Sequence, residues 1–105
     1  MYATVSDIVI KITPTDESHQ QVTIERKFHG GKEGKSEIVW KIFDKDDLTE
    51  PVTSMTTNDL SIPTDESVEG FFIGVDYYAK STTQREFSEP VSSELKQIPI
   101  RHPFL

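Results

Sequence analysis

β-Branched side chains dominate the apolar part of this sequence and alternate with polar ones. Valine and isoleucine together number 18 and threonine 11, whereas alanine, leucine and methionine together number only 8. Because β-branched side chains lose rotamer freedom in a helix and pack well on a pleated sheet, this bias favours strands along the chain. The longest alternating run covers residues 71–80, and no window places apolar residues at helical spacing. The sequence therefore predicts an all-β fold.

Polar turn sequences separate the alternating runs at short intervals, which predicts about seven strands. The expected strands lie near residues 8–12, 22–28, 38–42, 60–62, 71–80 and 87–98. Pro90 is expected to split the last of them or to keep it at a sheet edge. A lone tryptophan, Trp40, falls on the third run, where it would fill the space between two sheets. We therefore expect an immunoglobulin-like antiparallel β-sandwich over residues 1–98, with 99–105 as linker or C-terminal tail; an open barrel is the alternative.

Composition limits both the domain organisation and the partners. A chain of 105 residues is the size of one domain, and without cysteine it has no disulfide and no thiolate metal site. The net charge of −7 argues against nucleic acid as a partner, because neutralising phosphates requires a basic surface. No apolar run approaches the roughly 20 residues of a membrane span, so membrane insertion is not expected. Together with the missing glycosylation sequon, these features favour a cytoplasmic location.

Motifs that would indicate catalysis are weak or missing. Residues 34–36, Gly-Lys-Ser, resemble the end of a phosphate-binding loop, but His29 stands where that loop needs glycine. The residues that follow alternate as a strand, whereas a phosphate-binding loop must open a helix. The histidines His19, His29 and His102 are widely spaced and lack partners at metal-ligand intervals. We therefore expect no enzyme, no catalytic residue and no cofactor.

Acidic residues are expected to gather at one end of the sandwich. The pentapeptide Pro-Thr-Asp-Glu-Ser occurs at 14–18 and again at 63–67, and in this topology both copies lie at the pole that also receives the loop after Trp40. The spacing of residues 44–50 does not match a calcium-binding EF-hand loop. The set at this pole is Asp16, Glu17, Asp44, Asp46, Asp47, Asp65 and Glu66, of which Asp44, Asp46, Asp47, Asp65 and Glu66 are the candidates for a calcium site.

Basic residues are expected at the opposite pole, beside the glycine-rich loop and the last hairpin tip. The candidate binding residues there are Arg26, Lys27, Lys32, Lys35, Lys80 and Arg85. The chain would enter the sandwich at this basic pole and leave at the acidic one. Tandem copies would then meet acidic end to basic end. Such a contact fixes the relative orientation of neighbours more than it raises their affinity. The edge beyond Pro90 is a second candidate site, for strand addition.

Residues 28–95 resemble a known repeat. The pattern begins with an aromatic residue, a Gly-Gly pair, Gly-x-Ser and a tryptophan on the next strand. It continues with Val-x-Gly and ends with a Pro-Val-Ser-Ser run. The residues concerned are Phe28, Gly30, Gly31, Gly34, Ser36, Trp40, Gly70 and Pro90. This pattern is similar to the immunoglobulin-like repeats of plant and protist microtubule-associated proteins that also carry leucine-rich repeats (the auxin-induced-in-root-cultures family).

The resemblance implies a non-catalytic building block of a long cytoskeletal protein. Its partners would be neighbouring repeats of the same chain and other proteins, with the acidic tails of tubulin as a candidate for the basic pole. The motif residues would be structural, the glycines permitting positive φ or close backbone approach and Trp40 packing the core. The alternative is an extracellular adhesin-type sandwich at the cell surface that binds protein or carbohydrate, with or without calcium.

Overall fold

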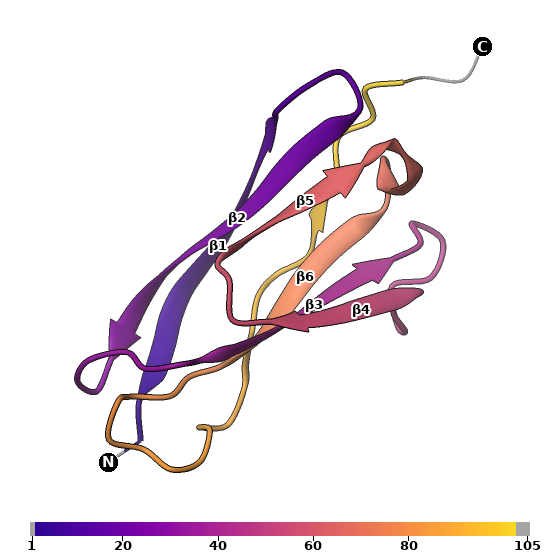
Figure 1. Ribbon diagram of the computed structural model, residues 1–105. Coiled ribbons are helices and arrows are strands. Elements are labelled where there is room, and N and C mark those ends of the chain that lie inside the picture. The colour runs from indigo at the N-terminus through magenta and orange to yellow at the C-terminus, as the bar shows by residue number, and fades with distance from the viewer. Residues whose placement is uncertain (1, 103–105) are drawn as a thin grey trace.

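The computed structural model describes residues 2–102 and consists of two antiparallel sheets packed face to face (Figure 1). One sheet has the order β1-β2-β5 and the other β4-β3-β6-β7, with β8 also paired to β6. The strands are β1 (Thr4–Pro14), β2 (His19–His29), β3 (Glu37–Phe43), β4 (Thr53–Thr57), β5 (Ser61–Asp65), β6 (Phe72–Tyr78), β7 (Val91–Ser92) and β8 (Lys96–Gln97), with a 3-10 turn η1 (Glu66–Val68). The predicted all-β fold with two antiparallel sheets is confirmed.

The connections follow the Greek-key pattern of an immunoglobulin-like sandwich. After the β1–β2 hairpin the chain crosses to the other sheet, forms β3 and β4, and returns so that β5 pairs with β2. It then crosses again to β6, which lies against β3. Residues 37–43 are therefore a strand, β3, as the alternation predicted, and not the helix that a phosphate-binding loop would require.

The core lies between the sheets and centres on Trp40, which is only 1% exposed. Ile38 on the same strand and Ile73 and Tyr77 on β6 complete the β3–β6 side, and Val22 of β2 faces them. The indole N–H donates a hydrogen bond to Thr57 Oγ1 at 3.0 Å, so the ring is buried without leaving its polar atom unpaired. The predicted place of Trp40 between the sheets is confirmed.

A bulge in β1 changes which side of the strand faces the core. Val5 and Ile10 are both buried although one is odd-numbered and the other even-numbered. The register with β2 shifts between Ser6 and Val9, and Asp7 inside the bulge has a φ of 55°. Because a bulge adds one residue to one strand of a pair, it lets Val5 on one side and Ile10 on the other point inward.

The last predicted strand, residues 87–98, is divided into two short strands, as the position of Pro90 predicted. Pro90 precedes the two-residue strand β7, and residues 93–95 separate β7 from β8, although both pair with β6. The side chain of Leu95 lies over Gly74, where a Cβ would come within 2.5 Å of the leucine. The split strand therefore covers the outer edge of β6.

One strand was not predicted from the sequence. β4 carries Thr-Ser-Met-Thr-Thr, and its first four residues are all exposed. Because it lies at the edge of its sheet and most of its side chains face solvent, no apolar alternation marks it. Both copies of the repeated pentapeptide begin in a strand, but only Pro14 of the first copy belongs to β1, whereas Pro63, Thr64 and Asp65 of the second all belong to β5.

The molecule is elongated, with extents of 54 × 28 × 20 Å. The N-terminal and C-terminal ends lie at opposite ends of the long axis (Figure 1). Within the described residues no helix has the length and apolar character needed to cross a membrane.

Candidate interaction surfaces

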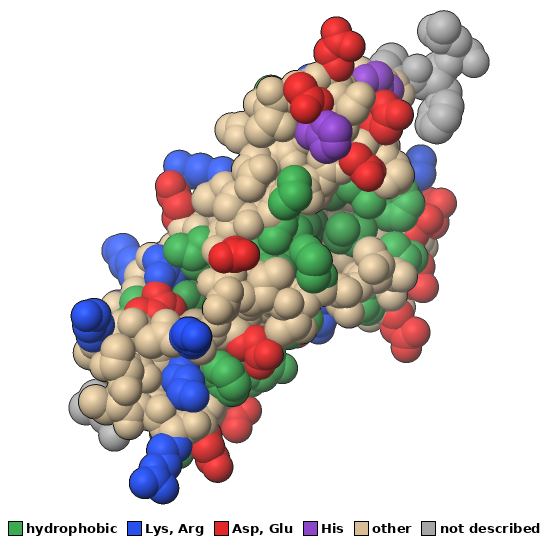
Figure 2. All heavy atoms as spheres, in the orientation of Figure 1, with side chains coloured by type: hydrophobic (Ala, Val, Ile, Leu, Met, Phe, Trp, Pro, Cys, Tyr) green, Lys and Arg blue, Asp and Glu red, His purple; other side chains and the backbone are tan. Residues whose placement is uncertain are grey.

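The glycine-rich loop and the last hairpin tip lie side by side and form the basic pole. Backbone hydrogen bonds join them, from Gly34 N–H to Lys80 C=O at 2.8 Å and from Thr82 N–H to Lys32 C=O at 2.9 Å. The exposed side chains of Lys32, Lys35 and Arg85 therefore share one end of the molecule, and Lys80 lies there with its ammonium 5.1 Å from the ring centre of Phe87. Most of the blue side chains in Figure 2 lie toward this end, with a few red ones among them.

Glycine is required at two positions of this pole. Gly30 has a φ of 103°, and a Cβ there would lie 2.8 Å from Ala3 Cα. At Gly34 a Cβ would lie 3.0 Å from the Ser81 carbonyl oxygen. A side chain at either position would push apart the segments that build the pole, so the expected role of these glycines is confirmed. Gly31 and Gly70 also have positive φ.

Arg26 was predicted to be a binding residue of the basic pole, but in the structure its charge is used in an internal ion pair. Its guanidinium is paired with Glu33, and its Nε donates to the Tyr77 hydroxyl at 3.0 Å. Glu33 also accepts hydrogen bonds from the Tyr77 hydroxyl and, at 2.6 Å, from Ser36 Oγ, which in turn accepts from Lys80 N–H at 3.1 Å. The Arg26 and Glu33 side chains are 20% and 21% exposed. The cluster therefore ties the glycine-rich loop to β2 and β6.

The protonation states of the cluster follow from its contacts. Burial raises the pKa of Tyr77, and the hydrogen bond that its hydroxyl donates to Glu33 raises it further. Burial acts to lower the pKa of Arg26, but the hydrogen bond to Tyr77 and the charge of Glu33 raise it overall. Near neutral pH the tyrosine is therefore a neutral donor and the arginine a cation. Ser36, which the resemblance assigned a structural role, is buried inside this cluster.

Lys27 differs from Arg26 because its side chain points outward from β2. It is 72% exposed, and its ammonium lies 3.5 Å from the Asp7 carboxylate. An exposed pair of this kind contributes little stability, so Lys27 remains available to a partner. Phe28, the next residue, packs against the core from the same strand.

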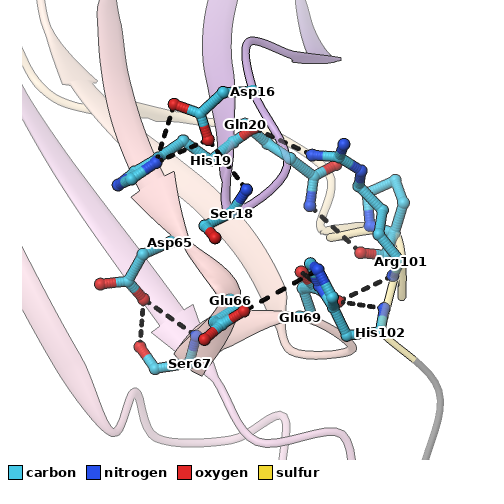
Figure 3. Close-up of polar contacts among 11 residues, drawn as sticks. Asp16, Ser18, His19, Gln20, Asp65, Glu66, Ser67, Glu69, Arg101 and His102 are labelled. Atoms are coloured by element: carbon cyan, nitrogen blue, oxygen red, sulfur yellow. Dashed lines mark hydrogen bonds and ion pairs between the residues drawn. The ribbon is translucent and has the colours of Figure 1, made fainter.

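The two copies of the repeated pentapeptide lie together at the opposite, acidic pole (Figure 3). Asp16 accepts from Ser18 N–H at 2.8 Å, and Asp65 accepts from Ser67 N–H at 2.9 Å, so both copies use the same aspartate-to-serine contact. His19 stands opposite Asp65 in the β2–β5 register. The predicted meeting of these two segments at one pole is therefore present in the structure, despite their different secondary structure.

Glu69 attaches the C-terminal segment to this pole, a role that was not predicted from the sequence. One carboxylate oxygen accepts from the backbone N–H of Arg101 at 2.7 Å and of His102 at 2.8 Å. The other lies 2.7 Å from His102 Nδ1, and the Glu69 side chain is only 6% exposed. Gln20 adds a hydrogen bond to the Pro99 carbonyl at 3.2 Å. Residues 99–102 are therefore attached to the domain; 103–105 lie outside the described residues.

The carboxylates predicted as calcium ligands do not form a metal site. Across residues 2–102, no three His, Asp or Glu side chains lie close enough to hold a metal ion. Asp44 accepts from Asp46 N–H at 2.9 Å, and Asp47 accepts from Thr49 N–H at 3.0 Å, so each stabilises its own turn. Their loop joins β3 to β4, whereas Asp65 is the last residue of β5 and Glu66 the first of η1. The calcium hypothesis therefore has no site in the described structure.

The acidic pole predicts a loss of stability in acid. Burial acts to raise the pKa of Glu69, but hydrogen bonds from Arg101 and His102 lower it overall, and Ser67 lowers the pKa of Asp65. Groups with a lowered folded-state pKa contribute stability that is present above their unfolded value, about 4, and is lost as pH falls through the folded value. We expect the Tm, followed by circular dichroism, to fall between about pH 5 and about pH 2.

Glu69→Gln tests whether titration of Glu69 itself contributes to the loss of stability in acid. The amide keeps an acceptor oxygen for the backbone N–H groups but cannot titrate. The variant should be less stable than the original chain near neutral pH and should lose less Tm on acidification. Equal losses in both proteins would show that Glu69 does not contribute to the acid sensitivity.

A groove opens between the edge strands β4 and β5, on the face shown in Figure 2. Its volume is about 400 Å³, and its apolar lining comes chiefly from Trp40, Ile42, Met55, Ile62 and Val68. His19 and Asp65 line its end at the acidic pole. This groove was not predicted from the sequence, because one of its walls is the unpredicted strand β4.

Comparison of the chain with models of protein families, with curated proteins and with solved structures gives no match.

Proposed function

We propose that the chain is a non-catalytic structural and protein-interaction module that contacts neighbouring modules end to end. The observation that carries this proposal is the placement of the chain ends at oppositely charged poles. Ala3 lies at the basic pole, where its N–H donates to Gln84 at 2.8 Å. Arg101 lies at the acidic pole, where its guanidinium donates to the His19 carbonyl at 3.0 Å. A following module would therefore present its basic pole to the acidic pole of this one.

The charges at the two poles are suited to orienting such a contact. Among the described residues, Lys32, Lys35 and Arg85 have no carboxylate within 4.0 Å, so their charges remain available to a neighbour. Asp16 and Asp65 are exposed and have lowered pKa values, so they stay ionised at neutral pH. Complementary exposed charges of this kind raise the rate of encounter and fix the orientation more than they raise affinity.

The motif that resembles a repeat of microtubule-associated proteins supports a cytoskeletal setting in the cytoplasm. Its glycines, Gly30, Gly31 and Gly34, belong to the loop that builds the basic pole. A basic pole is also a suitable surface for the acidic tails of tubulin, which gives this module a second protein partner beside its neighbours. The proposal is thus a repeat of a larger microtubule-associated protein, with the basic pole as its binding face.

Co-sedimentation with microtubules tests the binding face. Replacing Lys32 and Lys35 with glutamate should lower the bound fraction at least fivefold at low salt, because four units of charge change at the pole. The matched control replaces Lys11 and Lys45 with glutamate; both are exposed, and the net charge changes equally. If the two double variants bind alike, the basic pole is not the tubulin-binding face.

A further inference from the structure

The groove between β4 and β5 is bounded by the outer strands of two different sheets. β4 ends the order β4-β3-β6-β7, and β5 ends the order β1-β2-β5. Within the described residues neither strand has a second strand partner, so both have backbone N–H and C=O groups directed away from their sheets. An open strand edge beside an apolar groove is the arrangement into which an extended peptide can add as a further strand.

β5 is protected against strand addition. The Ile24 N–H donates to the Leu60 carbonyl at 2.9 Å, and in an antiparallel ladder the inward bonding alternates along the strand. The backbone groups of Ser61, Pro63 and Asp65 therefore point away from β2. Pro63 has no N–H to donate, and the carboxylate of Asp65 stands at the end of the strand. A peptide cannot form a continuous ladder along this edge.

The outer edge of β1, at the far side of the same sheet, is also protected. The bulge at Asp7 interrupts its regular bonding pattern. Farther along, the ammonium of Lys96 donates to the Ile10 carbonyl at 3.1 Å and so occupies one of its backbone acceptors. Bulges and lysine side chains at an edge are the usual means of preventing unwanted pairing.

β4 has neither kind of protection. Its five residues include no charge and no proline, and their backbone is paired only with β3. Met55 at its centre is 47% exposed and lines the groove. Side chains of an added strand would point alternately toward and away from the groove, so every second residue of a partner would meet the accessible part of its apolar lining, Met55, Ile42 or Val68.

We propose that the β4 edge receives an extended basic segment of a partner protein, added as a strand. Apolar side chains at every second position of that segment enter the groove, and a lysine or arginine at one end lies beside Asp65. Charge selects this occupant: Asp65 lines the end of the groove, Glu66 follows it, and the whole chain carries −7. A second copy of the chain would bring the same negative charge to the contact. This site is separate from the basic pole and does not depend on the end-to-end function.

Synthetic peptides provide the test. The probes are acetylated and amidated peptides of the form Lys-Thr-X-Thr-Val-Thr-Lys, with valine, leucine, phenylalanine or tyrosine at X, and the same peptides with glutamate at both lysine positions. Binding is measured by isothermal titration and by amide chemical shifts. At least one basic peptide should bind about tenfold or more tightly than its acidic counterpart, with the largest shifts in β4. If no basic peptide binds, or if the shifts fall elsewhere, the proposal is wrong.

Two lysine variants distinguish a local effect at the groove from the effect of net charge on peptide binding. Met55→Lys places a cation beside the groove, whereas Val9→Lys places one on β1, at a residue that is similarly exposed (49%). Both change the net charge by the same amount. Met55→Lys should weaken binding of the basic peptide about tenfold or more, and Val9→Lys should weaken it less than about twofold. Equal effects of the two variants on peptide binding would contradict the proposal. It would also be wrong if the chain dimerised without peptide and Met55→Lys abolished the dimer, because the β4 edge would then pair with a second copy.

Discussion

Replacing Trp40 with alanine is expected to lower the free energy of unfolding by about 3–5 kcal/mol, the usual cost of emptying a large aromatic site in a core. The indole is 1% exposed and lies between the two sheets, so its removal leaves a cavity that neither sheet can close alone. It also leaves the Thr57 hydroxyl without its indole partner. The midpoint of urea unfolding, followed by far-ultraviolet circular dichroism, measures the loss.

Two further variants identify the cause of that loss. Trp40→Phe keeps part of the ring volume and should cost less than Trp40→Ala. Phe87→Ala removes an aromatic ring that is 42% exposed and should cost about 1 kcal/mol or less. If Trp40→Ala were no more harmful than Phe87→Ala, the tryptophan would not be the centre of the core.

Glu33→Ala is expected to lower the free energy of unfolding by about 2–3 kcal/mol, below the 3–5 kcal/mol typical of fully buried pairs because this pair is partly exposed. The change removes the acceptor shared by Arg26, Tyr77 and Ser36. An arginine charge and a tyrosine hydroxyl are then left in a largely buried site with no carboxylate. Urea unfolding measures the effect, and the loop over residues 30–35 should show faster amide hydrogen exchange.

The control for Glu33, which lies in the loop after β2, is Glu25 on β2 itself. Glu25 pairs with Lys11 at 3.1 Å, but both side chains are more than half exposed, at 59% and 57%. Glu25→Ala should therefore cost about 0–1 kcal/mol. A double-mutant cycle with Arg26→Ala and Glu33→Ala should show coupling above about 1 kcal/mol. Additive effects of the two changes would mean that the pair does not tie the loop to the sheet.

The fold class was predictable because its signal is local. Alternating β-branched residues form strands wherever one face of the strand is buried, as in β2, β3 and β6. The positions of Trp40 and Pro90 were predictable for the same reason, since a large ring requires a core and a proline interrupts a strand. β4 was missed because an exposed edge strand has no buried face to produce alternation.

The functional surfaces depend on contacts between distant segments, so only part of them could be predicted. The glycines and the charged residues of both poles follow from loop composition and topology. The internal role of Arg26 does not, because it depends on Glu33 and Tyr77, which approach only when the loop folds over the sheet. Glu69 was missed for a similar reason, since it acts on backbone groups more than thirty residues away. The groove depends on which strand edges face each other.

Paramagnetic relaxation between molecules tests the end-to-end contact most directly. The sequence contains no cysteine, so a single nitroxide can be attached through Glu17→Cys at the exposed tip of the acidic pole. The labelled chain is mixed with isotope-labelled, cysteine-free chain at about 20 mM salt, where charges are weakly screened. End-to-end contact predicts broadening of amide signals in residues 30–35 and 80–85 that disappears at about 500 mM salt. Broadening spread evenly over the surface, or confined to β4 and β5, would contradict it.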